Sequence, residues 1–445
     1  MAIDRRSVLG LSAGSAAGAL LPTPSRASPQ PLGSLGLDVT HFGVNAGSPD
    51  DQSDALQRAI DASADARVPL WLPAGTYIAA DLVLKSGTQL YGVRGATRLL
   101  LGHGAAIAAC ARADQVTLQG IVFDGRSQFL PEGRGLLSLR EVRGLRILDC
   151  YLQESGGSGI SLAGVEGEIS HTTIVGAAGG GITVQDGRGV TLSHNTIFQC
   201  GSHGIRVDRA QRGHDGTQIL SNRIEHIGAS GTAKGDGIVI EQASAVIVAD
   251  NQIRRCQASG LSAKGAASLH VRGNAFSASG DFAVRAEDGL DGAIISGNTI
   301  NDAAGGISVS DREAGGRLVA CQGNLVRNLR GEPATGRGVG IAVEADSAIT
   351  GNVIEGAPLA GILAGFGKHL RDVTVTGNVV RTAPIGVGVS VETGSGSALI
   401  AHNLIADVSQ GAVIGMAGGR AVTGDLAGSE PSRFASITIS GNRVR

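Results

Sequence analysis

The chain has 445 residues, of which 70 are glycine, with 3% aromatic residues, 42% hydrophobic residues and a formal net charge of -2. So many glycines and so few bulky side chains indicate many short strands joined by tight turns, rather than spherical cores. A charge close to zero gives no electrostatic reason to expect nucleic acid or an anionic membrane as a partner, and we expect neither.

The first 27 residues form a targeting segment. Arg5 and Arg6 precede an apolar stretch, residues 8–21, that is too short and too rich in glycine and alanine to span a bilayer permanently. Ser25-Arg26-Ala27 offers a cleavage site. The segment resembles a bacterial twin-arginine signal, which implies the twin-arginine export machinery as a partner during secretion and a periplasmic or secreted product.

Residues 28–90 are predicted to form an N-terminal cap and the first coil. A helix is expected from about residue 51 to 67, with Leu56, Ala59, Ile60 and Ser63 on one stripe. A helix used once before a long run of strands suits a cap, because the first coil of a stacked sheet has an unpaired edge.

Residues 91–445 carry an apolar alternation that ends in asparagine and recurs every 23 to 39 residues. A period of this size is typical of a solenoid. The marked positions are Asn195, Asn222, Asn251, Asn274, Asn298, Asn324, Asn352, Asn378, Asn403 and Asn442. They fall in one column, which predicts a ladder of stacked side-chain amides.

A second alternation, typified by Gly-Ile, lies between the asparagines. Two strands per turn of about 25 residues predict an all-β fold, a parallel β-helix with a short N-terminal helical cap and roughly fourteen coils. Its central residues are Ile160, Ile182, Ile205, Ile238, Leu261, Val284, Ile307, Ile341, Ile362 and Val389.

The cap and the two repeated elements together resemble the right-handed parallel β-helix proteins of the pectate-lyase-like superfamily. With Arg5 and Arg6, the whole chain resembles a family of twin-arginine-translocated repeat proteins of unassigned function. The superfamily resemblance implies that a polysaccharide or oligosaccharide lies along a groove on one strand face. The gaps 205–238 and 307–341 are about ten residues longer than a bare coil, and we expect these insertions to wall the groove.

The five cysteines match no metal-ligand spacing. Cys200 and Cys256 fall in an interior column two coils apart, about 9.6 Å along the axis, which is beyond disulfide reach. We expect five free thiols, as suits a protein that folds in a reducing cytosol before export.

Charged residues concentrate on the outer face of four middle coils. If each Ile-equivalent points inward, the residues one and three positions later point outward. The charged outward residues of these coils are Arg206, Asp208, Glu241, Lys264, Arg285 and Glu287, which we call the patch. In later coils the same rule gives two more charged outward residues, Glu344 and Glu392, the latter counted from Val389.

The patch suggests chemistry on an acidic polysaccharide, by a lyase or an epimerase. Such an enzyme needs a cation against the substrate carboxylate, for which Arg206, Lys264 and Arg285 are candidates, and a base, for which His203 or a lysine is a candidate. Glu287 is expected to contact substrate beside Arg285.

A glycoside hydrolase instead needs two carboxylates, for which Asp208, Asp236 and Glu241 are available. Ser202-His203-Gly204-Ile205 resembles the Gly-His-Gly stretch of polygalacturonases, although the paired aspartates of that family are absent one coil earlier, where Asp186 stands alone. No cofactor motif is present, and Ca²⁺ between Asp208 and Glu241 is the ion left open.

A structural alternative accounts for the same residues. Glu241, Lys264 and Glu287 alternate in sign within one column, as a solvated salt-bridge ladder does. His203 lies over Asp236 in the predicted register, and such a pair would fix a turn. The protein is then a non-catalytic β-helix that binds glycan or serves as a structural rod.

Overall fold

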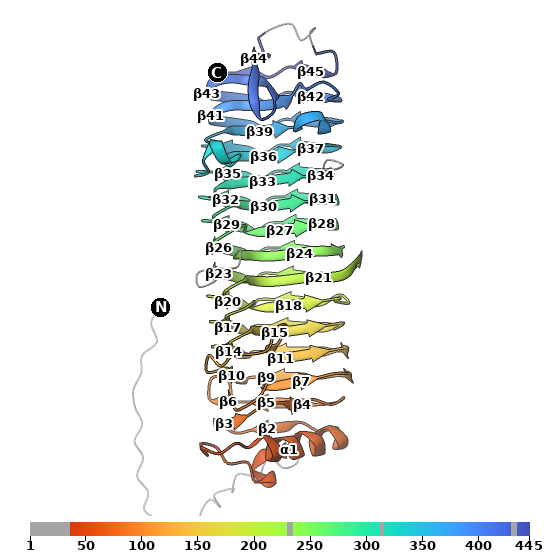
Figure 1. The fold of residues 1–445 in the computed structure, drawn as a ribbon, viewed down its shortest axis with the longest axis vertical. Helices are drawn as coiled ribbons and strands as arrows, with labels where there is room; N and C mark the ends of the chain where they lie inside the picture. The colour runs from red at the N-terminus through yellow and green to blue at the C-terminus, as the bar shows by residue number, and fades with distance from the viewer. Residues whose placement is uncertain (1–35, 229–234, 312–315, 429–433) are drawn as a thin grey trace, which may run out of the picture.

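The computed structural model describes residues 36–228, 235–311, 316–428 and 434–445. These residues form one elongated column of stacked parallel strands, a β-solenoid of about 13 turns, close to the roughly fourteen predicted (Figure 1). The segment 1–27 assigned to the export signal lies outside the described residues. No helix within the described ranges is long and apolar enough to cross a membrane.

Three columns of strands, which we call faces A, B and C, make up the walls of the solenoid. Face A carries the Gly-Ile elements. Its strands are β4 (Leu82–Val83), β7 (Ala108–Cys110), β11 (Gly135–Arg140), β15 (Ser158–Ala163), β18 (Ile182–Gln185), β21 (His203–His214), β24 (Asp236–Ser244), β27 (Leu261–Lys264), β30 (Phe282–Glu287), β33 (Gly305–Ser310), β36 (Val339–Val343), β39 (Ala360–Ala364) and the C-terminal halves of β41 (Val379–Ser390) and β43 (Leu404–Ala417).

Face B carries the alternations that lead up to the asparagines. Its strands are β1 (Leu37–Asp38), β2 (Leu70–Leu72), β5 (Gln89–Gly92), β9 (Thr117–Gln119), β13 (Leu145–Leu148), β16 (Gly167–Ser170), β19 (Thr191–Ser193), β22 (Gln218–Leu220), β25 (Ile247–Ala249), β28 (Ala267–Arg272), β31 (Asp291–Ser296), β34 (Arg317–Gln322), β37 (Ser347–Thr350), β40 (Val373–Thr376), β42 (Ala398–Ala401) and β45 (Ile437–Ser440).

Face C follows directly after the asparagines. Its strands are β3 (Gly75–Ala79), β6 (Thr97–Leu101), β10 (Val122–Asp124), β14 (Tyr151–Gln153), β17 (Thr173–Val175), β20 (Thr196–Phe198), β23 (Arg223–Ile227), β26 (Gln252–Cys256), β29 (Ala275–Ser277), β32 (Thr299–Asn301), β35 (Leu325–Arg327), β38 (Val353–Glu355), the N-terminal halves of β41 and β43, and β46 (Arg443–Val444). A small pair, β8 (Ala113–Asp114) and β12 (Val142–Arg143), lies apart from this sheet.

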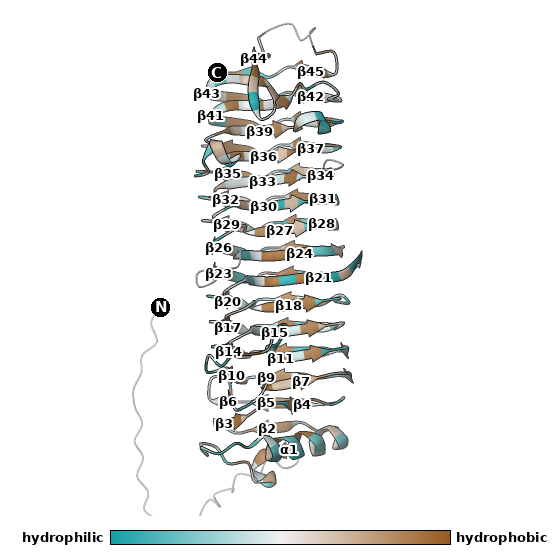
Figure 2. Cartoon of the chain, viewed as in Figure 1, coloured by the Kyte–Doolittle hydropathy of each residue, from teal (hydrophilic) through white to brown (hydrophobic). Residues whose placement is uncertain are grey.

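The core runs through the whole column. One cluster of buried side chains extends from Val39 to Ile437, and its members come from all three faces. In Figure 2 the strands of face A are largely brown, while teal stretches lie toward the outer ends of β21 and β24. Each coil therefore buries its inward side chains against the coils before and after it, as expected for a solenoid.

Helix α1 (Ser53–Ala66) covers the first coil, as the sequence predicts (Figure 1). Its expected stripe, Leu56, Ala59, Ile60 and Ser63, is buried. The Gln57 side chain satisfies the backbone of β4, because Nε2 donates to the Val83 carbonyl at 3.0 Å and Oε1 accepts from the Val83 N–H at 2.8 Å. A short 3-10 helix, η2 (Val39–Phe42), precedes it.

The other end of the column is closed by a hairpin. Strand β44 (Arg420–Asp425) runs antiparallel to β43. The Asp425 carboxylate accepts the N–H groups of Ala412 at 2.8 Å and Val413 at 3.0 Å. Both ends of face A therefore have side chains that pair with edge backbone groups, which removes the templates for further strand addition.

The predicted asparagine ladder is confirmed. Each asparagine from Asn195 to Asn403 donates its backbone N–H and its side-chain Nδ2 to the Oδ1 of the next asparagine, at 2.8 to 3.0 Å. Nδ2 also donates to a carbonyl of an earlier coil, such as Val271 for Asn298. The ladder fixes the corner between faces B and C.

The five cysteines are free and buried, in agreement with the prediction. Ile227 pairs with Cys256 and lies one coil beyond Cys200, so two coils separate these thiols. Burial raises the thiol pKa of Cys150, Cys200 and Cys321 to about 12. Such thiols are protonated at neutral pH and shielded from reagents.

Thiol titration checks this arrangement. The native protein at pH 8 should react negligibly with a thiol reagent, whereas the denatured, unreduced protein should show five free thiols. Three or fewer thiols in the denatured protein would show that cysteines pair, which the observed register does not allow.

Replacing a central rung of the ladder should cost far more stability than replacing its last rung. Asn298→Ala leaves the N–H of Asn274 buried without its acceptor, so we expect the free energy of unfolding to fall by about 3 kcal/mol. Asn442→Ala, at the partly exposed end, should cost about 1 kcal/mol or less. Urea unfolding of the two variants measures the difference, and equal losses would contradict an energetic role for the buried ladder.

Candidate functional site

The strand register places the patch residues as predicted. Asp208 pairs with Glu241, Glu241 with Lys264, and Lys264 with Glu287 on successive strands of face A. The predicted register is wrong at the last repeat, because Ile362 pairs with Val387 and not with the predicted Val389. The outward residues of that strand are therefore Gly388 and Ser390.

Each cationic side chain of the patch forms an ion pair with a carboxylate of the protein. Arg206 Nη2 lies 2.6 Å from Glu241 Oε2, and its Nε lies 3.2 Å from Asp208 Oδ1. Lys264 Nζ lies 3.1 Å from Asp288 Oδ2. These ion pairs join residues of different columns. The expected salt-bridge ladder of Glu241, Lys264 and Glu287 along one column is therefore not formed.

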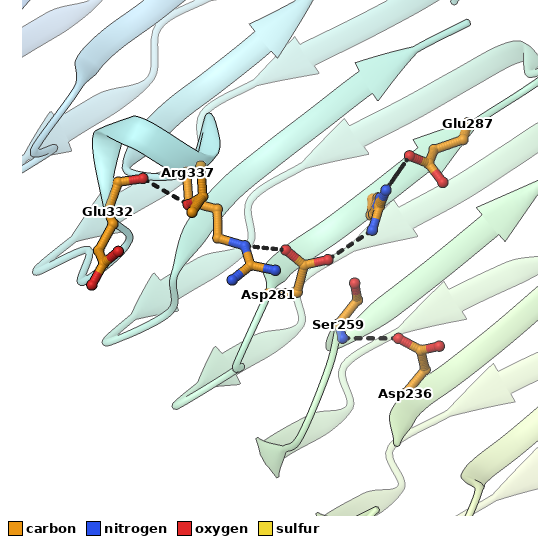
Figure 3. A network of polar contacts seen from close by, with 8 residues as sticks. Asp236, Ser259, Asp281, Glu287, Glu332 and Arg337 are labelled. Atoms are coloured by element: carbon orange, nitrogen blue, oxygen red, sulfur yellow. Dashed lines mark hydrogen bonds and ion pairs between the residues drawn. The ribbon is translucent and has the colours of Figure 1, made fainter. Parts of the chain in front are cut away.

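Asp281 joins a second group of these pairs, as Figure 3 shows. Its Oδ2 lies 2.8 Å from Arg285 Nη1, and its Oδ1 accepts from Arg337 Nε at 3.0 Å. Arg285 Nη2 also lies 2.6 Å from Glu287 Oε1. Arg337 belongs to the insertion 307–341, so this network ties that insertion to the strand face.

The pKa of Asp208 is raised by its surroundings. Burial raises the pKa of Asp208, Arg206 opposes this rise, and the charges of Glu241 and Asp186 add to it. Arg206 thus occupies the place between Asp208 and Glu241 where Ca²⁺ was considered. Within the described part of the chain, no group of three or more His, Cys, Asp or Glu side chains is arranged to hold a metal ion.

His203, the first residue of β21, is half-buried and packs against the preceding coil. Its Nε2 lies 3.0 Å from Thr183 Oγ1 and its Nδ1 lies 3.0 Å from Ser202 Oγ. The ring fills the space beside Gly180, where a Cβ would lie 2.0 Å from Nε2. Both ring nitrogens are thereby engaged, and the register partner Asp236 accepts from the N–H of Ser259 at 2.8 Å.

Burial, reinforced by the Arg206 charge, lowers the pKa of His203 to about 4. The ring is therefore neutral at neutral pH and has little affinity for a substrate proton. The observed contacts favour the structural alternative for this residue, while the catalytic roles assigned to the patch stay predictions.

A pocket of about 810 Å³ lies further along face A, over β33 to β43. Three segments wall it. The insertion 307–341 contributes Ala334, which belongs to the 3-10 helix η3 (Pro333–Thr335), and Gly336 just after it, as expected for a groove wall. The 3-10 helix η4 (Gly367–His369) and the turn at Gly418 before β44 form the other walls.

Glu344 lines this pocket with 8% of its surface exposed, the same exposed fraction as Asp311. Its Oε2 accepts two backbone N–H groups, from Asp311 at 2.7 Å and Gly316 at 3.2 Å. None of the described residues donates to Oε1. Burial raises the pKa of Glu344, Asp311 adds to the rise, and the two N–H groups and His369 oppose it.

Two basic side chains line the same pocket. Lys368 and His369 both belong to η4. Lys368 is exposed and forms no ion pair with any residue in the described ranges, unlike the three patch cations. The pocket is therefore lined by a cation without an ion-pair partner among the described residues and by a carboxyl group whose pKa burial raises.

The sequence contained only part of the signal for this pocket. Glu344 was among the predicted outward residues, and the insertion 307–341 was predicted as a wall. Lys368, His369 and Asp311 were missed, because they follow their strands in segments without a repeat pattern. A cluster of charges after β33, β36 and β39 would have been the available signal.

The sequence matches the family described as right handed beta helix region over residues 110–236 and 236–405. The chain belongs to this family. No curated protein shows significant sequence similarity to it.

Solved structures share the fold. An N-terminal fragment of bacteriophage phi29 gene product 12 aligns at a TM-score of 0.60 with 15% identity, over 93% of this chain and 71% of that chain. A family 28 exopolygalacturonase of Yersinia enterocolitica aligns at 0.51 with 12% identity, over 92% and 77%. At these identities the likeness shows a common β-helix architecture.

The state of His203 can be tested by the pH dependence of stability. An unfolded histidine takes up a proton below pH 6.5, whereas folded His203 does so only near pH 4, so its contribution to stability is lost as pH falls through this range. Wild type should lose up to about 1.4 kcal/mol per pH unit more than His203→Gln between pH 6.5 and 4. Urea unfolding at several pH values measures this difference.

The exposed His194 offers a matched control. His194→Gln should keep the wild-type pH dependence. A His203→Gln variant with an unchanged pH slope would show that His203 titrates normally and is open to solvent.

Proposed function

We propose that the protein binds an acidic polysaccharide along face A and cleaves or epimerises it by acid–base chemistry in the pocket over β33 to β43. One observation carries this proposal. Lys368, which has no ion-pair partner among the described residues, lines the same pocket as Glu344, whose carboxyl group is buried and held by backbone N–H groups.

The cation requirement favours the pocket over the patch. Removing the C5 proton of a uronate requires a positive charge near the substrate carboxylate. Arg206, Lys264 and Arg285 each lie in an ion pair, so a substrate carboxylate would have to displace a carboxylate of the protein. Lys368 needs no such exchange.

In the proposed reaction one pocket residue binds the substrate carboxylate and two others transfer protons. Lys368 holds the uronate carboxylate, and His369 accepts the proton from C5. Glu344, protonated on Oε1, donates its proton to the glycosidic oxygen as the C4–O4 bond breaks and the C4–C5 double bond forms. Epimerisation uses the same groups when Glu344 returns a proton to C5 from the opposite side. The scheme invokes no metal ion.

The common fold supports a carbohydrate ligand. The Yersinia structure is named as an exopolygalacturonase, and its chain has the same stacked-coil architecture. A column with a continuous outer strand face suits an extended polymer, because successive sugar units meet successive coils.

We also infer that the protein is exported and acts in the periplasm or outside the cell, as a member of the twin-arginine-translocated repeat family. Arg5 and Arg6 before residues 8–21 support this inference. Free buried thiols also suit folding in a reducing compartment before export.

A non-catalytic role as a glycan-binding or structural rod is the second candidate. The internally neutralised ion pairs of the patch favour it for the middle coils. In that role the chain needs no proton donor, and Glu344 would serve only to hold the loop that includes Gly316.

Matched pairs of variants distinguish these assignments. Purified protein is screened against uronate polymers by ultraviolet absorbance for unsaturated ends, by reducing-sugar release and by proton NMR for C5 configuration. Glu344→Gln and Lys368→Met should each lower turnover about 100-fold or more, because each removes a group that acts on the reacting sugar. Asp208→Asn and Lys264→Met should stay within about threefold of wild type.

The opposite pattern, with loss only in the two patch variants, would move the site to the middle coils and contradict the pocket. Binding of a polymer by wild type without any turnover would support the non-catalytic candidate. Thermal melting of all four variants shows whether any of them is unfolded. Loss of an exposed ion pair such as Lys264 with Asp288 should lower the free energy of unfolding by about 1 kcal/mol or less.

A further inference from the structure

The floor of the pocket differs in polarity across its width. Ala342 and Leu363 point outward at paired positions on β36 and β39. Two residues after Ala342, Glu344 directly follows the end of β36, and Ser390 stands two residues after Gly388 on β41. Outward positions two residues apart are separated by about 7 Å. One side of the floor is therefore apolar and the other is polar.

The apolar side continues into a small cluster outside the core of the column. Leu359 and Leu363 pack against Ala360, Ile385, Ile414 and Met416, and this cluster is separate from the main core. Leu359, Leu363 and Met416 line the pocket. Phe366, 57% exposed, lies at the same pocket. An unsubstituted uronate offers these side chains only the C–H groups of its ring and no methyl group.

We propose that the pocket recognises an acetylated sugar unit, with the acetyl methyl group against Leu359, Leu363 and Met416 and the sugar carboxylate toward Lys368. This inference rests on the proposed function and specifies its substrate class. Contact of a methyl group with this apolar side removes both surfaces from water, which favours the acetylated form.

The proposed orientation requires the acetyl group and the carboxylate to lie at different positions around the sugar ring. In a pyranose uronate the hydroxyl groups on C2 and C3 lie across the ring from the carboxylate on C5. An acetyl group on either oxygen can reach the apolar side while the carboxylate stays near Lys368. A methyl ester on the carboxylate would instead remove the charge that Lys368 complements.

An acetyl group can come from an O-acetylated uronate or from an N-acetylated amino sugar, and the test separates the two sources. Three probes are titrated into the full-length mature protein: an O-acetylated polyuronate, the same polymer after mild alkaline deacetylation, and an N-acetylhexosamine oligomer. We expect the acetylated polyuronate to bind at least about tenfold more tightly than its deacetylated form.

Leu363→Ser should abolish this preference, because the acetylated polymer then binds no more tightly than its deacetylated form. Serine is compatible with this column, because Ser308 occupies the equivalent position two coils earlier. Leu399→Ser is the matched control, since Leu399 is an outward leucine of face B with threonine neighbours in its column and should keep the preference.

Each result decides the proposal. Equal binding of both polyuronates by wild type, without tight binding of the N-acetylhexosamine oligomer, would overturn acetyl recognition and leave the proposed function intact. No binding of any probe would overturn both. Tight binding of the N-acetylhexosamine oligomer that depends on Leu363 would support acetyl recognition and assign the amino-sugar source. The wild-type comparison needs no variant, so it stands even if Leu363→Ser fails to fold.

Discussion

The positions of the side chains on the three faces depend on backbone hydrogen bonds between parallel strands of successive coils. These bonds fix the spacing at about 4.8 Å and pair each residue with one partner in the next coil. Asp208 lies over Glu241 because Ile205 pairs with Ile238, and the same register places Ala342 beside Leu363. A side chain on one face therefore meets neighbours set by the repeat, wherever the chain between them runs.

The asparagine ladder shows how a local pattern can predict a buried structure. Asn195 and its equivalents each end an apolar alternation, so the sequence alone predicts their common column. The side chain is short, and inside the column its amide meets the next asparagine and nearby backbone carbonyls. Geometry leaves little choice of partner, and the prediction succeeds. The same reasoning succeeds for the stripe of α1, where burial follows directly from helical spacing.

The strand register does not determine which partners the exposed charged side chains contact. Arg206 has a long side chain and reaches diagonally to Glu241, while Lys264 turns to Asp288 beyond the strand end. The sequence places the Cα atoms correctly but not the charged groups, because several carboxylates lie within reach of each cation. The error at Val389 has a related origin. Residues 385, 387, 389 and 391 are all apolar, and such an alternation looks the same after a shift of two residues.

The pocket combines both kinds of residue. Its floor belongs to the repeat, and its walls belong to η3, η4 and the β44 hairpin, which follow no repeat. On the regular face, cations and carboxylates are abundant and neutralise one another. Where the insertions rise, Glu344 is shielded from water and Lys368 is left without a carboxylate partner among the described residues. Burial raises the pKa of Glu344, because a carboxyl group removed from water is costly to ionise. Departures from the repeat are therefore what allow a regular column to hold a chemically distinct site.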